Sequence, residues 1–341
     1  MARKTERYIK ADKKDIVHEW LIEQFMDYLR AEGKSKKTLK NYESDLRIWF
    51  SWFEENCKFK GQAKTFNQLK AIDMIKFQAE LLEKGMSINR YSRLKSVISS
   101  LANYCENVLA EDDDYPEFKN FRNICNKVKK PIKEAVREKT ILQDVDIQNL
   151  LDQLVENKKY QQACALALAV YSGSRKAELL EFKVNYFKDE NLKFGGSLYK
   201  TPEKIRTKGK MLEKYVLAKQ FKPYFDLWME ERNKKNINNE YLFVKNNNGV
   251  YERAKESQLN YYAEYFTKLL DADFYWHSCR HFWTTSLAQQ GLPDAIIKTL
   301  TGWQSLEMVS IYKDIDDDEE LGKYFDEDGI KQVEEKKLTD L

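Results

Sequence analysis

Apolar residues in the first third of the chain recur with the period of amphipathic helices. Four stretches show steps of three and four residues between apolar positions, and they begin near residues 20, 35, 66 and 87. In the second stretch one helical face collects the apolar side chains, which are Leu39, Tyr42, Leu46, Trp49 and Phe53. The third runs over 66–82, and the fourth leaves Arg90 and Arg93 off its apolar face. The pattern predicts an all-helical domain over residues 17–126.

The following part of the chain mixes helical patterns with short alternating ones. A helix over 145–155 with Asp144 as its cap precedes an apolar helix over 163–171 that ends at Gly173. Alternating stretches predict a small antiparallel sheet from strands at 182–187, 197–201 and 213–217, with a turn at Lys208-Gly209. Further helical patterns cover 219–234, 255–270, 278–289 and 293–300. The prediction is a mainly α protein with a small antiparallel β-sheet in a second domain over 141–312.

Charge is distributed unevenly around these two domains. The chain of 341 residues has a net charge of only +3, but residues 313–341 hold 12 acidic and 5 basic side chains, so the rest carries +10. Residues 127–140 are rich in lysine and arginine with few apolar anchors, which predicts a basic interdomain linker. Residues 1–16 are polar and predicted to be flexible. A basic body suits a polyanionic partner, although so modest an excess is also typical of ordinary solubility.

Several cellular settings are disfavoured by the sequence. It has no apolar run near the length of a transmembrane helix, and its charged N-terminus lacks the apolar core of a secretory signal. The five cysteines are scattered, odd in number and without a Cys-x-x-Cys pair, which favours a reducing cytoplasm. We therefore expect a cytoplasmic protein without a membrane partner.

Two of the three histidines of the chain bracket an arginine. They lie in the segment His277-Ser278-Cys279-Arg280-His281. Their spacing suits a zinc helix, but Ser278 replaces the glutamate and Arg280 would place a cation beside the metal, so we expect no metal. An isolated pair of this kind would be read as packing or capping histidines. Other motifs accompany it: Gly173-Ser174-Arg175-Lys176-Ala177-Glu178-Leu179 upstream, and Leu300-Thr301-Gly302-Trp303 followed by Tyr312 downstream.

These motifs, in this order, closely resemble those of the tyrosine recombinase/integrase family. The family pattern is an arginine, a lysine on a β-turn, His-x-x-Arg, Leu-Gly-His/Trp and a nucleophilic tyrosine. The resemblance extends to the Ser-x-x-Thr-x-x-x-Tyr stretch of the family's core-binding module, here Ser35, Thr38 and Tyr42. It implies a helical core-binding domain over 17–126 and a catalytic domain over 141–312. The acidic tail over 313–341 contains several apolar residues, so we expect either that it docks in trans on a neighbouring protomer or that it merely solubilises the chain.

The resemblance also assigns roles to individual residues. Arg175 and Arg280 would clamp the scissile phosphate, because a guanidinium fork meets two oxygens at once. Tyr312 would attack it to form a 3′-phosphotyrosyl link, with His277 as proton acceptor or orienting group. Lys208 would protonate the departing 5′ oxygen. Trp303 stands where histidine is commoner, and its indole can donate a hydrogen bond but cannot shuttle a proton.

Alternatives remain at several of these positions. Glu178 could pair with Arg175 on one helix face, and Lys210 could take the role of Lys208. For His281 a structural role and a functional one are equally favoured, and a purely packing role is open for Trp303. Tyr324, in the acidic tail, is a weaker candidate nucleophile.

The family implies double-stranded DNA as the partner, held by a homotetramer on two recombination sites, with an excision or host factor as a possible further partner and no cofactor. Strands would exchange through a Holliday junction, and bound protein would be nucleoid-associated. For phosphate contacts the basic residues of the first domain are the candidates, namely Lys36, Lys37, Lys40, Arg90 and Arg93. The competing functions are type IB topoisomerase or telomere-resolvase activity, and a non-catalytic DNA-binding regulator of the same fold.

Overall fold

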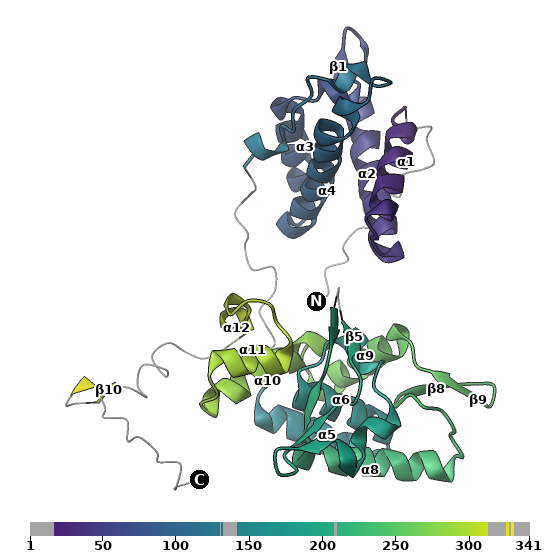
Figure 1. Ribbon diagram of the computed structural model, residues 1–341, viewed down its shortest axis with the longest axis vertical. Helices are drawn as coiled ribbons and strands as arrows, with labels where there is room; N and C mark the ends of the chain where they lie inside the picture. Colours follow the sequence, from purple (N-terminus) through teal and green to yellow (C-terminus); the bar gives the residue numbers. More distant parts are fainter. Residues whose placement is uncertain are drawn as a thin grey trace. The chain divides into compact units, whose positions relative to one another are not determined.

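The computed structural model describes residues 17–129, 131, 142–207, 210–312, 325–326 and 329–330. The chain divides into two compact units, with the division between residues 138 and 139 (Figure 1). Each unit has a hydrophobic core of its own. The protein is mainly α-helical with small antiparallel sheets, so the predicted fold class is confirmed.

In the described residues of the N-terminal unit, the α-helices pack side by side as a bundle (Figure 1). They are α1 (Glu19–Ala31), α2 (Lys36–Asn56), α3 (Ala71–Glu83) and α4 (Ile88–Asn107). Aromatic side chains of α2 and α3 fill the core, and Trp49, Phe53 and Phe77 are fully buried. Ser35 caps α2 by accepting a hydrogen bond from the N–H of Thr38 at 3.1 Å. The apolar period therefore located the bundle correctly.

The single helix predicted over 66–82 is wrong at its start. The chain instead forms a 3-10 turn, η1 (Phe66–Gln68), before α3 begins at Ala71. A separate helix begins at Ala71 because the Asp73 carboxylate accepts a hydrogen bond from the N–H of Lys70 at 2.9 Å, which caps the first turn. The hairpin and the turns that complete this unit are β1 (Lys58–Phe59), β2 (Gln62–Ala63), η2 (Leu109–Glu111), η3 (Pro116–Phe118) and η4 (Cys125–Lys127).

The C-terminal unit is built around one buried helix, α6 (Tyr160–Ser172). Residues 163–170 are completely buried on all faces, which the alanine- and leucine-rich sequence permits because small side chains allow close approach. Packed against α6 are α5 (Asp144–Glu156), α8 (Ala218–Lys234) and α10 (Trp276–Gln289) (Figure 1). Asp144 is not the cap of α5. The cap is Gln143, whose N–H donates to Asp146 at 3.0 Å.

The strands of this unit are short and antiparallel. The three-stranded sheet has the order β3 (Leu192–Lys193), β4 (Leu198–Lys200) and β7 (Tyr215–Leu217). Two hairpins are separate from it, β5 (Ile205–Thr207) with β6 (Lys210–Leu212), and β8 (Val244–Asn247) with β9 (Val250–Arg253). The strand predicted at 182–187 is wrong. Most of that segment forms the 3-10 turn η5 (Val184–Phe187), which buries both Tyr186 and Phe187.

The remaining helices complete the C-terminal unit. They are α7 (Lys176–Leu179), η6 (Asp189–Asn191), α9 (Glu256–Leu270), α11 (Asp294–Thr301) and α12 (Glu307–Tyr312). A second apolar cluster, which includes Trp283, Ile297, Trp303 and Val309, packs α10, α11 and α12 together. The last strands are β10 (Phe325–Asp326) and β11 (Gly329–Ile330). Within the part of the chain that the structure describes, no helix has both the length and the apolar content needed to cross a membrane.

Candidate active site

Arg175 is positioned by a tight turn at the end of α6. Gly173 closes that helix in the left-handed region at φ +57°, and a Cβ added there would lie 2.3 Å from Cδ1 of Trp283. Only glycine fits this turn without strain. Ser174 is held by the preceding turn, since its N–H donates to Oγ of Ser172 at 3.2 Å. The chain therefore delivers Arg175 to the first position before α7.

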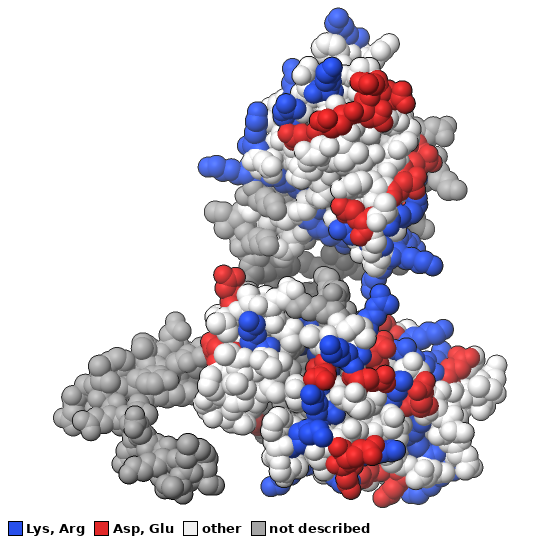
Figure 2. Space-filling model, in the orientation of Figure 1, with Lys and Arg blue, Asp and Glu red and all other residues white. Residues whose placement is uncertain are grey.

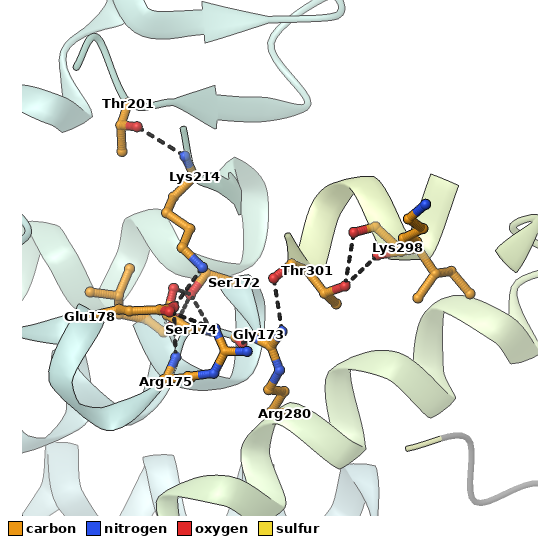
Figure 3. A network of polar contacts seen from close by, with 12 residues as sticks. Ser172, Gly173, Ser174, Arg175, Glu178, Thr201, Lys214, Arg280, Lys298 and Thr301 are labelled. Carbon is orange, nitrogen blue, oxygen red and sulfur yellow. Dashed lines mark hydrogen bonds and ion pairs between the residues drawn. The ribbon is translucent and has the colours of Figure 1, made fainter. Parts of the chain in front are cut away.

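A buried carboxylate holds the guanidinium of Arg175. Nη1 of Arg175 donates to Oε1 of Glu178 at 2.8 Å, and the Arg175 N–H donates to Oε2 at 3.0 Å (Figure 3). Oε2 also lies 2.5 Å from Nζ of Lys214. Glu178 and Lys214 are both almost completely buried, whereas the Arg175 side chain is 35% exposed. The predicted ion pair between Arg175 and Glu178 is therefore present in the structure, and the Arg175 side chain still reaches the surface.

Glu178 is ionised despite its burial. Burial alone would raise the pKa of this carboxyl, but the charge of Lys214 and the hydrogen bonds from Lys214 and Arg175 bring the pKa below its ordinary value. The cluster therefore contains one carboxylate between two cations.

Arg280 joins three segments from the interior. It is fully buried, and its Nη1 donates to the carbonyl oxygen of Gly173 at 2.7 Å while Nη2 donates to that of Thr301 at 2.8 Å (Figure 3). Its guanidinium carbon lies 4.7 Å from the centre of the Trp303 ring. Arg280 thus links the loop before Arg175 to the end of α11, and three of the predicted residues share one neighbourhood.

The two histidines lie on the first turns of α10. Their ring centroids are 5.5 Å apart and the rings are nearly perpendicular. His277 reaches the surface, yet partial burial of its imidazole, together with His281, Arg280 and Arg175, lowers the pKa of His277 to about 4. Around neutral pH the imidazole of His277 is therefore uncharged.

The side chains of three candidate catalytic residues lie outside the described part of the chain. Lys208 and the tail residue Tyr324 lie outside the described residues, and for Tyr312 only the backbone, at the end of α12, is described. The hairpin flanking Lys208 is located by Gly302, because a Cβ added to Gly302 would lie 2.5 Å from Cδ1 of Leu212 on β6. The β5–β6 hairpin therefore packs beside the loop that leads to Trp303.

The basic residues predicted to bind DNA fall into two groups in the N-terminal unit. Lys36, Lys37 and Lys40 are exposed on the first turns of α2. The other group, on α4, binds a buried carboxylate: Nη2 of Arg90 lies 2.6 Å from Oδ1 of Asp45, and Nε of Arg93 lies 3.0 Å from Oδ2. Asp45 is 1% exposed. The arginines are therefore held in fixed positions rather than simply solvated.

Sequence reasoning missed two of the charged residues that build these sites. For Asp45 a signal was available, because its place between Tyr42 and Trp49 puts a carboxylate on the apolar face of α2. For Lys214 no pattern in the chain distinguishes it from the exposed lysines nearby. Figure 2 shows basic and acidic side chains interspersed over the visible face of the C-terminal unit, so surface charge does not mark the site either.

Fold and site together define a two-domain enzyme of the tyrosine recombinase class. The chain belongs to the phage integrase family: the model of that family matches residues 140–319, and the N-terminal SAM-like domain of phage integrases matches residues 22–104. The SPbeta prophage-derived recombinase-like protein YomM of Bacillus subtilis is 31% identical over 252 residues, which are 73% of this chain and 72% of that protein. The tyrosine recombinase XerA of Pyrococcus horikoshii is 26% identical over 302 residues, 88% of this chain and 91% of that one.

Solved structures share the fold at lower identity. The site-specific recombinase XerH, bound to a palindromic difH substrate in a post-cleavage complex, matches with a TM-score of 0.62 and 16% identity over 89% of this chain and 82% of that one. A lambda integrase dimer bound to a COC′ core site matches with a TM-score of 0.60 and 14% identity over 86% of this chain and 94% of that one.

Proposed function

We propose that this enzyme is a site-specific DNA recombinase that cleaves and rejoins strands through a 3′-phosphotyrosyl intermediate at Tyr312. The supporting observation is the contact between Arg280 and the carbonyl of Gly173, two residues before Arg175. It brings the two arginines of distant motifs to one loop, as a clamp on a single phosphate requires. Fixed cations at the non-bridging oxygens stabilise the charge that develops during phosphoryl transfer.

The chemistry then needs only groups of this chain. The Tyr312 oxygen forms a bond to phosphorus while the bond to the 5′ oxygen breaks, so that the bond energy is retained for rejoining. His277, neutral at physiological pH, accepts the tyrosine proton or orients the tyrosine hydroxyl, and Lys208 donates a proton to the departing 5′ oxygen. Attack by the 5′-hydroxyl of a partner strand reverses these steps. Trp303 packs against Arg280 and is proposed to donate its indole N–H to the phosphate.

Double-stranded DNA carrying a recombination site is the proposed partner. Lys36, Lys37 and Lys40 stand at the N-terminus of α2, where lysine is unfavourable for the helix dipole, so their cluster is better explained by phosphate contacts. Arg90 and Arg93 are proposed to contact the same duplex from α4. In support, the XerH and lambda integrase structures with this fold are bound to DNA sites.

The assembly is proposed to be a homotetramer that exchanges strands on two sites through a Holliday junction. Residues 313–341, which for the most part lie outside the described residues, are proposed to dock on a neighbouring protomer and to regulate delivery of Tyr312. An excision or host factor would set the direction of the reaction.

A nicked suicide substrate carrying a candidate site from the DNA that flanks the gene tests the chemistry. We expect a covalent protein–DNA adduct that is lost in Tyr312→Phe and kept in Tyr324→Phe, the matched control. Chelation with EDTA leaves the adduct unchanged, because Arg175 and Arg280 carry the neutralising charge. Absence of an adduct at every site would favour the regulator, and relaxation of supercoiled DNA without strand exchange would favour a topoisomerase.

A further inference from the structure

Lys214 is a buried cation that the proposed chemistry does not use. It lies between β6 and β7, and its side chain is 1% exposed. Its backbone is held on both sides by Thr201: the Lys214 N–H donates to Oγ1 of Thr201 at 3.0 Å, and the Thr201 N–H donates to the Lys214 carbonyl oxygen at 2.9 Å (Figure 3). The backbone at residue 214 is therefore fixed independently of the lysine side chain.

The ammonium group of Lys214 shares a carboxylate with the phosphate clamp. Glu178 presents Oε2 to Nζ of Lys214 at 2.5 Å and Oε1 to Nη1 of Arg175 at 2.8 Å. A buried carboxylate interacts strongly with nearby charges, because the surrounding dielectric is low. If Glu178 faced Arg175 alone, the pair would be neutral and would attract a phosphate much less than a free guanidinium does.

We propose that Lys214 is a positioning residue that neutralises Glu178, so that this carboxylate can orient Arg175 without cancelling the positive charge that Arg175 presents to the DNA phosphate. The proposal rests on the proposed function. With Lys214 in place, the carboxylate of Glu178 is balanced by one cation, and the positive charge of Arg175 is left for the phosphate.

A double-mutant cycle separates this role from a structural one. Lys214→Met keeps the Thr201 backbone contacts but leaves Glu178 unbalanced, and we expect adduct formation in single turnover to slow by about a hundredfold, the size of losing one fixed stabilising group. Adding Glu178→Gln removes the excess charge while the amide oxygen can still accept from Arg175. The double variant should therefore return to within about tenfold of the wild-type rate.

Two further variants bracket that result. Lys214→Arg keeps the charge and should react at close to the wild-type rate. Lys200→Met is the matched control, because Lys200 forms a similar but exposed pair with Glu213 at 2.8 Å. It should leave the rate unchanged. Thermal unfolding of each variant establishes that it is folded. If Lys214→Met does not fold, the rate of adduct formation can still be compared between Glu178→Gln and the double variant. This comparison measures what Lys214 contributes when no carboxylate is present, and we expect that contribution to be small.

A neutral phosphate provides a readout that a structural role would not change. A methylphosphonate at the scissile position carries no negative charge for an unbalanced Glu178 to repel. On this substrate the decrease in the rate of adduct formation caused by Lys214→Met should therefore be only a few-fold. An equal loss on both substrates, or a double variant no faster than Lys214→Met, would overturn the proposal. Failure of the proposed function is distinguishable, because the wild-type enzyme itself would then form no adduct.

Discussion

Gly173→Ala should destabilise the C-terminal unit by two separate effects at one turn. The left-handed backbone at φ +57° costs a residue with a Cβ about 1–2 kcal/mol relative to glycine. The added Cβ would also lie 2.3 Å from Cδ1 and 2.8 Å from Cγ of Trp283, a ring that is 2% exposed and cannot swing away. Overpacking of this kind costs about 1–3 kcal/mol, so the expected total is about 2–5 kcal/mol.

Two other glycines provide reference values for this destabilisation. Gly291 has a similar φ of +80° with nothing within 4 Å of an added Cβ, so Gly291→Ala isolates the backbone cost of about 1–2 kcal/mol. Gly302→Ala should fall between the two, because its added Cβ meets only Cδ1 of Leu212, at 2.5 Å, which is the end of a flexible side chain. The expected order of destabilisation is Gly291→Ala, then Gly302→Ala, then Gly173→Ala.

Differential scanning calorimetry of the full chain measures the order directly. For a unit of this size each kcal/mol lowers the midpoint of unfolding by about 2–4 °C. Because the carbonyl of Gly173 accepts a hydrogen bond from Arg280, adduct formation by Gly173→Ala should fall as well, at a temperature where the variant is still folded. A Gly173→Ala variant no less stable than Gly291→Ala would refute the packing argument.

Two further predictions concern charged groups away from that turn. Asp45→Asn should lower the ratio of specific to non-specific DNA affinity by about tenfold, because Arg90 and Arg93 lose the carboxylate that fixes them and fixed phosphate contacts set the register of the protein on its site. Fluorescence anisotropy measures the ratio, and an unchanged ratio would contradict this. Asp27→Asn, at an exposed ion pair, is the control. In an imidazole NMR titration of the free protein, His277 should stay neutral at pH 5.5, because its pKa is about 4, and a midpoint near the ordinary histidine value would contradict the assigned environment.

The helices were predictable because their periodicity is a local property. The apolar stripe of α2 depends on spacing, and the run from residue 163 to 170 in α6 depends on local composition; both were located correctly. The segment 182–187 was misassigned because its apolar residues suit either a strand or a tight turn. Burial of Tyr186 and Phe187 in a 3-10 turn depends on neighbours that are distant in the sequence, such as Phe221 and Phe225 beside Phe187.

Site residues were predictable from the sequence only where they belong to a recognisable motif. Arg175, Arg280 and Trp303 come from motifs, and the structure gathers them around Gly173 and Thr301. Lys214 and Asp45 belong to no such motif. Their partners are fixed by tertiary packing. The position of Asp45 on the apolar face of α2 indicates burial but not which residues it binds, and nothing around Lys214 distinguishes it from a solvated lysine.

The buried charges of Glu178, Lys214 and Arg280 are unfavourable for stability unless they are well paired. Glu178, Lys214 and Arg280 are 2%, 1% and 0% exposed, and removing charged groups from water costs several kcal/mol each unless they are well paired. Replacing a buried ion pair with uncharged side chains of similar volume often leaves the free energy of unfolding unchanged or raises it. Replacing Glu178 and Lys214 together should therefore leave the stability of the unit unchanged or raised, while the clamp loses some of its rigidity. If the cluster adds little stability, its role is better explained by the phosphate, because Lys214 balances the carboxylate that holds Arg175.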